Sequence, residues 1–432
     1  MNQLRDAIGI VHETKNRWER RIPLIPEEIK SLIADGIEVR IERSPTRAFR
    51  DEEFAAVGAT MVDDATDCRF LMGVKEVKKS QVKPGQTVVC FSHTIKGQSH
   101  NMPLLRHFIE VGASLVDYEV IVDDNGVRQV AFGRYAGIAG AHETLWTLGH
   151  RMKSLGHDNA LAALKHSVDY HDLAEMARAT RSALDALREK GPDVFAPFIV
   201  AVTGDGRVSR GSLEYLKMVG AVPCTLDEAL TLERESPGDR TLRSLHVTDD
   251  MIYERAGMGR KFVFEHYLQT PWLYVSKGAM YLPYTRALIN GLYWDERFPR
   301  LLDDSTLRRM YANKTLPPVL GDVACDIRGG IEWTLMATEN DAPTFIYDPA
   351  KGTAHVGVEG EGVAIMAVDN LPTALPRDAS VDFSKALIPY VRAFFRANLN
   401  EGVGSLPAAL QNAVVVAGGK LSPRHQGLAR FL

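Results

Sequence analysis

Short apolar runs alternate with helical patterns along two long stretches of the chain. In the first stretch, the runs at residues 70–74 and 87–91 are apolar enough for buried strands, and amphipathic patterns separate the strand-like runs. A second series of the same kind opens at residues 198–202. Because a strand–helix–strand rhythm favours parallel strands with helices on both faces, the sequence predicts an α/β fold with parallel sheets.

The composition narrows the class of protein further. A length of 432 residues favours two or three domains, and a small net charge of -4 provides no electrostatic case for nucleic acid or an anionic membrane. No apolar stretch is long enough for a bilayer span, and the first residues lack the core of a signal peptide. We therefore expect a cytoplasmic protein.

The four cysteines and thirteen histidines predict no special chemistry of their own. The cysteines are scattered without a CxxC pair, which is typical of core thiols in a reducing compartment. The histidines form neither an HExxH motif nor a ligand-like cluster, so we expect no metal site.

Lys75 and His93 stand where two expected strands end, in the motifs GVKE and FSHTIKGQ. Parallel strands direct the residues at their ends into a common cleft. A lysine and a histidine there can divide proton transfers at an amine. The simpler alternatives are a surface lysine next to Lys78 and Lys79, and a structural histidine.

Arginines occur at two further junctions between expected elements. Arg21 lies in WERRIPLIP just before a helix start, and Arg128 and Phe132 lie in VRQVAFGRYAGIAGA. The guanidinium group suits bidentate binding of carboxylates, so both places are candidates for a dicarboxylate or amino-acid site. The alternatives are a charged helix start and an ordinary sheet edge.

A glycine-rich turn follows the strand expected at residues 198–202. Gly204 and Gly206 allow a tight turn and a close approach of backbone N–H groups to a pyrophosphate. Ser209 stands where the third glycine of GxGxxG belongs. An ordinary strand-to-helix turn is the alternative.

The expected next strand, at residues 220–225, has no acidic residue at its end, and Asp227 comes late. An acid at this place binds the 2′-hydroxyl of NAD. Its absence, with Arg207 and Arg210 in the loop, favours NADP(H), with NAD as the alternative.

Several motifs in one order resemble a known family. ETK at residues 13–15, GVKE, FSHTIKGQ, VAFGRYAGIAGA and VDNLPTALPRDAS are similar to saccharopine dehydrogenases of the alanine dehydrogenase and transhydrogenase superfamily. WERRIPL, INGLYW and VEGEG are similar in particular to the lysine–2-oxoglutarate reductase half of aminoadipic semialdehyde synthase. The resemblance is weakest across residues 155–197 and 231–267. Within the second range, residues 231–260 are charged and weakly periodic, which indicates an insertion or a long crossover.

This resemblance implies two Rossmann-like domains with the active site in the cleft between them. The first domain would cover residues 1–140 and be completed by residues 345–432. Linking helices would cover residues 141–196, and the dinucleotide-binding domain residues 197–344.

The implied reaction joins L-lysine to 2-oxoglutarate and reduces the imine with NADPH to saccharopine. Lys75 matches the acid/base on the secondary amine, and His93 matches the acid/base for the carbinolamine. The remaining positions that match or lie near family substrate contacts are Arg21, Arg128, Phe132, Leu292 and Tyr293.

The positions that match or lie near family contacts to the cofactor are Gln98, Gly204, Gly206, Arg207 and Asp326. After Asp326 the chain is shorter than the family pattern. A separate polypeptide, a glutamate-forming saccharopine dehydrogenase, would take the product. Two alternatives stay open: an NAD-dependent, lysine-forming saccharopine dehydrogenase, and a non-catalytic ligand-binding relative.

Overall fold

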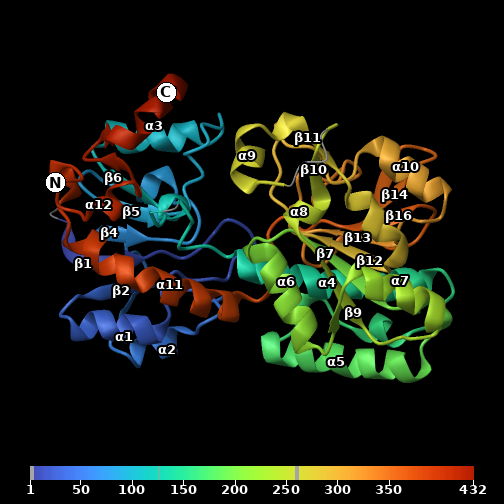
Figure 1. The fold of residues 1–432 in the computed structure, drawn as a ribbon. Coiled ribbons are helices and arrows are strands. Elements are labelled where there is room, and N and C mark those ends of the chain that lie inside the picture. Colours follow the sequence, from blue (N-terminus) through green and yellow to red (C-terminus); the bar gives the residue numbers. More distant parts are fainter. Residues whose placement is uncertain (1–3, 125, 258–261) are drawn as a thin grey trace. The chain divides into compact units, whose positions relative to one another are not determined.

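The computed structural model describes residues 4–124, 126–257 and 262–432, and it separates into two compact units. Unit 1 comprises Met1–Phe132 and Pro376–Leu432, and unit 2 comprises Gly133–Leu375. Each unit contains one sheet of eight strands, so the predicted α/β class with two parallel-dominated sheets is confirmed (Figure 1). Residues 345–375 group with unit 2, whereas the sequence-based division placed them with the first domain.

The sheet of unit 1 has the order β18-β17-β6-β5-β4-β1-β2-β3, and β1 to β6 run parallel. Only β17 and β18 are antiparallel to their neighbours. The strands are β1 (Arg5–Ile10), β2 (Val39–Glu42), β3 (Thr60–Val62), β4 (Cys68–Met72), β5 (Thr87–Cys90), β6 (Ser114–Asp117), β17 (Val414–Ala417) and β18 (Lys420–Leu421).

The helices of unit 1 cover both faces of this sheet. They are α1 (Pro26–Ala34), α2 (Asp51–Ala55), α3 (Met102–Glu110), α11 (Pro376–Arg396) and α12 (Ala408–Gln411). Successive strand residues point to opposite faces. Phe70 and Met72 accordingly join one core with residues of α1 and α11, while Leu71 joins a second core with residues of α3.

Helix α11 also holds the segment that leads into α1. The hydroxyl of Ser380 accepts a hydrogen bond from the backbone N–H of Ile22 at 3.0 Å, and that of Ser384 accepts one from Ile25 at 3.0 Å. These bonds satisfy two buried N–H groups just before the helix start. They tie the segment that carries Arg21 to a helix more than 350 residues away in sequence.

The sheet of unit 2 has the order β15-β14-β16-β13-β12-β7-β9-β8. β14 pairs antiparallel with both β15 and β16, and the other pairs are parallel. Its strands are β7 (Ile199–Thr203), β8 (Val222–Cys224), β9 (Arg243–Val247), β12 (Ala287–Asn290), β13 (Val319–Asp322), β14 (Thr344–Asp348), β15 (Thr353–Val356) and β16 (Val363–Met366). A separate antiparallel pair consists of β10 (Tyr253–Arg255) and β11 (Tyr274–Ser276).

The helices of unit 2 include the long α4, which has many buried residues. They are α4 (Gly133–Ser154), α5 (Leu173–Lys190), α6 (Arg207–Met218), α7 (Leu226–Glu235), α8 (Asp249–Ile252), α9 (Phe264–Gln269) and α10 (Asp304–Ala312). None of the helices within the described ranges is both long and apolar enough to cross a bilayer.

On the side away from β12, the strand next to β7 is β9 and not β8, which comes next in sequence. β8 follows α6 in sequence, but β9 lies between β7 and β8 in the sheet. The reading of residues 231–260 as an insertion or crossover therefore missed a central strand, because the sequence of β9 mixes Arg243 and His246 with apolar residues. Residues 258–260 of that stretch lie outside the described residues.

Ser209 is accommodated at the third glycine position by its hydroxyl group. The side chain is fully buried, and its Oγ donates a hydrogen bond to the carbonyl of Thr203 at 2.8 Å. Close helix packing is instead provided by two other glycines. A Cβ on Gly137 would lie 1.9 Å from the carbonyl oxygen of Val208, and one on Gly211 would lie 2.1 Å from that of Arg134. The altered loop therefore still allows α4 and α6 to approach closely.

Candidate active site

Four neighbouring strands of unit 1 bring chemically active side chains to one edge of the sheet. β1, β4, β5 and β6 are adjacent and parallel. Glu13 follows β1, Lys75 and Glu76 follow β4, His93 follows β5, and Glu119 follows β6. The carboxyl ends of parallel strands meet at one edge, where α/β proteins bind ligands. This edge is therefore the candidate active site.

Glu13 shapes the turn that carries Lys75. One carboxylate oxygen accepts the backbone N–H of Val74 at 2.5 Å, and the other accepts that of Lys75 at 3.2 Å. The Lys75 side chain is half-buried. Since the turn's N–H groups are satisfied by a residue from a neighbouring strand, the position of Lys75 depends on Glu13.

Glu13 is held mainly in its protonated form at neutral pH. Burial, followed by the negative charge of Glu19, raises the pKa of Glu13 to about 8. The N–H bonds from the turn and the charge of Arg21 oppose that shift.

A pH dependence of stability follows from this raised pKa. Between about pH 4.5, the ordinary value, and about pH 8, folded Glu13 keeps a proton that the unfolded chain has lost. Stability therefore falls as pH rises through this window, by up to ~1.4 kcal/mol per pH unit from this group. We expect Glu13→Gln to remove this slope, measured as unfolding free energy from pH 5 to 8.

Glu27→Gln, a change on the exposed first turn of α1, is the matched control and should keep the slope of the wild type. Parallel stability curves for the wild type and Glu13→Gln would contradict the raised pKa. Other titrating groups do not affect the result, because they are common to all three proteins.

Arg21 is buried in an ion pair and packs on an aromatic ring. Its Nε donates to Glu19 Oε1 at 2.7 Å, and its guanidinium carbon lies 4.1 Å from the centre of the Phe132 ring. Burial alone would raise the pKa of Glu19, but the charge and hydrogen bonds of Arg21 outweigh burial and lower it. Phe132 stacks in turn on Phe383 of α11, with ring centres 4.3 Å apart.

His93 is oriented by the carboxylate next to Lys75. Its Nδ1 lies 3.2 Å from Glu76 Oε2, and Glu76 also pairs with Lys15. Burial works against ionisation of Glu76, yet the hydrogen bonds from His93 and Lys15 outweigh it and lower its pKa to about 2. His93 also has a φ of 54°, a strained backbone for a residue with a side chain. Strain of this kind is found where a side chain must be aimed.

Arg128 pairs with the acid that follows β6. Its Nη2 donates to Glu119 Oε1 at 2.6 Å, and the Arg128 side chain is 41% exposed. Arg128 is thus partly exposed, whereas Arg21 is enclosed.

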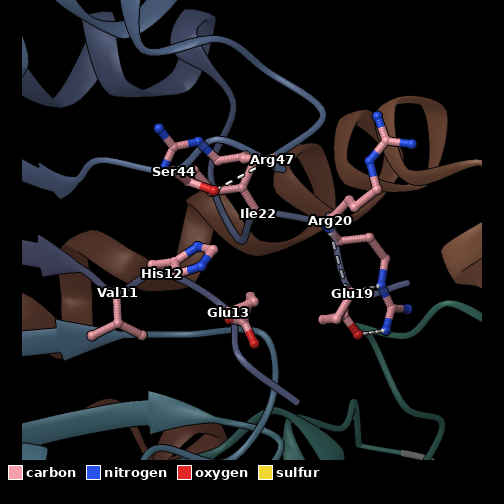
Figure 2. A pocket seen from close by; sticks show the side chains of 9 residues that line it. Val11, His12, Glu13, Glu19, Arg20, Ile22, Ser44 and Arg47 are labelled. Atoms are coloured by element: carbon pink, nitrogen blue, oxygen red, sulfur yellow. Dashed lines mark hydrogen bonds and ion pairs between the residues drawn. The ribbon is translucent and has the colours of Figure 1, made fainter. Parts of the chain in front are cut away.

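A small pocket lies beside the Glu13 and Glu19 carboxyl groups, and Figure 2 shows these two side chains with Arg20 and Arg47 around it. It is a small hollow that is partly open to solvent. Its lining residues are Val11, His12, Glu13, Glu19, Arg20, Arg21, Ile22, Ser44 and Arg47. Three arginines and two glutamates line this pocket, so its lining carries side chains of both charges.

The predicted dinucleotide loop lies in unit 2 between β7 and α6. Gly204 has a φ of +95°, which favours glycine, and Gly206 is the N-cap of α6. Arg207 is the first residue of α6 and is exposed. A Cβ on Gly206 would meet nothing within 4 Å, so this side of the turn is open to a ligand.

The other predicted site residues of unit 2 are Leu292, Tyr293 and Asp326, and they differ in burial. Leu292 is buried and packs near Gly204. Tyr293 is 70% exposed, and its hydroxyl donates to Asp295 at 3.1 Å. Asp326 lies in the loop after β13, and its charge contributes to raising the pKa of Tyr293, after burial and Asp295.

Within unit 1, the structure brings several predicted residues together. Lys75, His93, Arg21 and Phe132 belong to one network of contacts in unit 1. Gln98 is exposed in the loop after β5. Within the described ranges, no group of three His, Cys, Asp or Glu side chains could hold a metal ion.

Sequence reasoning left Glu13, Glu76 and Glu119 outside the predicted catalytic and binding residues. The sequence position of these three glutamates could have identified them, because each follows one of the neighbouring strands at its carboxyl end. No sequence pattern indicated the stacking of Phe383 on Phe132, since the two rings come from distant parts of the chain.

Comparisons with known protein families agree with this architecture. Residues 9–139 match the alanine dehydrogenase/PNT N-terminal domain, and residues 287–424 match the alanine dehydrogenase/PNT C-terminal domain. The chain belongs to the alanine dehydrogenase/PNT family. The family places the chain among the pyridine-nucleotide-dependent dehydrogenases.

Individual relatives extend the match to nearly the whole chain. The sequence is 32% identical to alpha-aminoadipic semialdehyde synthase of Arabidopsis thaliana over 98% of this chain and 41% of that protein. It thus spans less than half the length of that relative. It is 27% identical to the NAD(+), L-lysine-forming saccharopine dehydrogenase of Yarrowia lipolytica, over 86% of this chain and 88% of that protein.

A solved structure of L-alanine dehydrogenase shares the fold. It has a TM-score of 0.62 at 19% sequence identity and covers 98% of this chain and 99% of its own. This likeness supports the fold alone.

Proposed function

We propose that the protein is a lysine–2-oxoglutarate reductase, which condenses L-lysine with 2-oxoglutarate and reduces the imine to saccharopine. The observation that carries the proposal is the placement of Lys75 and His93 at the ends of adjacent strands β4 and β5. The carboxyl group of Glu13 accepts the backbone N–H of Lys75, and the Glu76 carboxylate contacts the ring of His93. The similarity to aminoadipic semialdehyde synthases and lysine-forming saccharopine dehydrogenases supports this choice of substrates.

The proposed chemistry needs two separate proton carriers. The lysine amine must lose a proton before its nitrogen attacks the keto carbon of 2-oxoglutarate. The carbinolamine oxygen must then gain a proton to leave as water, which gives an iminium. A reduced nicotinamide, when bound, would supply the hydride that reduces the iminium carbon. We assign His93 to the carbinolamine oxygen and Lys75 to the nitrogen, since groups in different environments can differ in pKa and divide such work.

The substrate carboxylates require cationic partners. Arg128 pairs with Glu119 and is partly exposed, and we propose that it also binds a substrate carboxylate. Arg21 is enclosed by Glu19 and Phe132, and we propose that it shapes the carboxylate site together with Phe132. Gln98, Gly204, Gly206, Arg207 and Asp326 remain proposed cofactor contacts, with Leu292 and Tyr293 as proposed neighbours of the substrate.

NADPH as the reductant stays a prediction. It was based partly on the missing acid at the end of residues 220–225, but β8 does not neighbour β7. Arg207 and Arg210 are its remaining support.

The test is an assay of purified protein with L-lysine, 2-oxoglutarate and either NADPH or NADH. We expect loss of nicotinamide absorbance that requires both substrates, with saccharopine as the product identified by mass spectrometry. Turnover only in the reverse direction, from saccharopine and NAD, would favour the lysine-forming saccharopine dehydrogenase. No turnover in either direction, with cofactor binding intact, would favour a non-catalytic ligand-binding relative.

A further inference from the structure

We propose that Ser92 and Asp117 are positioning residues, which hold His93 in the backbone conformation that directs its ring within the candidate site. This inference deepens the proposed function and rests on it, because His93 is assigned there to the carbinolamine oxygen. The side chains of Ser92 and Asp117 are fully buried, so they act through His93 and not on a substrate.

The backbone of His93 needs support from its surroundings. Its φ of 54° lies in the left-handed region, where the Cβ of a residue other than glycine is crowded by the backbone. Such a conformation persists only where neighbouring groups over-determine it. The ring Nδ1 lies 3.2 Å from Glu76 Oε2. Relaxation of the backbone would therefore move the ring away from this carboxylate.

The hydroxyl group of Ser92 links the two residues that flank His93. Its Oγ accepts the backbone N–H of Thr94 at 3.3 Å and lies 2.8 Å from the Thr94 hydroxyl oxygen. The same hydroxyl donates to Oδ2 of Asp117. Because Ser92 and Thr94 are both fully buried, water cannot replace these bonds. They hold the backbone on both sides of the histidine.

Asp117 anchors this turn to the sheet. Its Oδ2 also accepts the backbone N–H of Ser92 at 3.1 Å, and its Oδ1 accepts that of Glu119 at 2.8 Å. Asp117 is the last residue of β6 and pairs with Cys90, the last residue of β5. Burial raises the pKa of Asp117, and the hydrogen bonds from Ser92 and Glu119 oppose that shift. The carboxylate cannot turn away without leaving backbone N–H groups unpaired, which is costly in a buried place.

A second element holds the other side of His93. The side-chain Nδ2 of Asn101 donates to the carbonyl oxygen of His93 at 2.8 Å. Asn101 is the N-cap of α3, a place where an asparagine side chain usually accepts an N–H of its own helix. Here it makes no such bond. The conformation of His93 is thus supported from β6 and from α3.

The experiment compares Ser92→Ala with Ser114→Ala. Ser114 is the first residue of β6, is also fully buried, and its Oγ accepts the backbone N–H of Gly418 at 2.9 Å. Both variants therefore remove a buried hydroxyl that accepts one backbone N–H. We expect Ser92→Ala to lower kcat by about tenfold or more, because a small misplacement of a reacting group can cost ~10²-fold. Dissociation constants of the nicotinamide cofactors should not change, and Ser114→Ala should keep the kcat of the wild type.

Two further readouts separate positioning from a general loss of stability. In a His93→Gln background, Ser92→Ala should lower kcat by less than about twofold further, because residues that act through one group are not additive. Hydrogen exchange followed by mass spectrometry should show faster exchange of residues 91–95 in Ser92→Ala. Ser114→Ala should leave the exchange of that segment unchanged.

Wild-type kcat in Ser92→Ala would overturn the inference, and so would an equal loss of kcat in the His93→Gln background. If Ser92→Ala does not fold, Ser92→Cys takes its place, because a thiol keeps the shape of the side chain but is a weak hydrogen-bonding group. Failure of the proposed function is separate, because it shows as a wild type without turnover on lysine and 2-oxoglutarate. The exchange comparison still decides in that case, and unchanged exchange at residues 91–95 in Ser92→Ala would refute the role of Ser92.

Discussion

Lys75→Met is expected to lower kcat for the reductive condensation by about 10²–10⁴-fold, the usual contribution of a general acid/base, and to leave the dissociation constants of the nicotinamide cofactors unchanged. Methionine keeps the length of the side chain but carries no proton. The turn should persist in the variant, because Glu13 binds the backbone N–H groups of Val74 and Lys75 and not their side chains.

Lys78→Met is the matched control for this prediction. Lys78 lies in the same segment but is exposed to solvent, so its substitution should leave kcat unchanged. Wild-type turnover in Lys75→Met would refute the acid/base assignment. An equal loss in Lys78→Met would point to a general effect of positive charge in this segment.

Arg21→Met is expected to destabilise unit 1 by about 3–5 kcal/mol, because it leaves the Glu19 carboxylate buried without its partner. The two side chains are only 1% and 0% exposed, so water cannot replace the lost guanidinium. The measurement is the unfolding free energy from denaturant titration. The packing of Arg21 on Phe132 adds to the cost, although methionine retains part of that contact.

The double variant Glu19→Gln, Arg21→Met separates charge from packing. Because it removes both charges, it should recover a large part of the stability that Arg21→Met alone loses. A single variant as stable as the wild type would show that Glu19 takes up a proton or reaches water. A double variant no more stable than the single one would assign the loss to packing.

Part of the candidate active site of unit 1 could be predicted from local sequence. Lys75 and His93 follow continuous apolar runs, and such runs form buried strands wherever helices can cover both faces. The same reasoning located Gly204 and Gly206 at a strand-to-helix turn. These features depend on residues that are close together in sequence, so a pattern of hydrophobicity and glycine is sufficient to find them.

The partners of these residues could not be predicted in the same way. The pairing of Glu13 with the Lys75 turn joins residues 62 positions apart, and Phe383 reaches Phe132 from a distant helix. WERRIPLIP contains Glu19 and Arg21, yet only the fold shows that this pair is enclosed. Enclosure depends on what packs around a segment, which the segment itself does not specify.

The sequence by itself determined the strand–helix rhythm, the two candidate acid/base residues and the glycine turn, because each is a local property of the chain. Only the tertiary structure decided the order of strands in unit 2. Hydrogen bonding between strands is a long-range interaction, and it placed β9 beside the glycine turn instead of β8. That order changes which residues lie next to the turn.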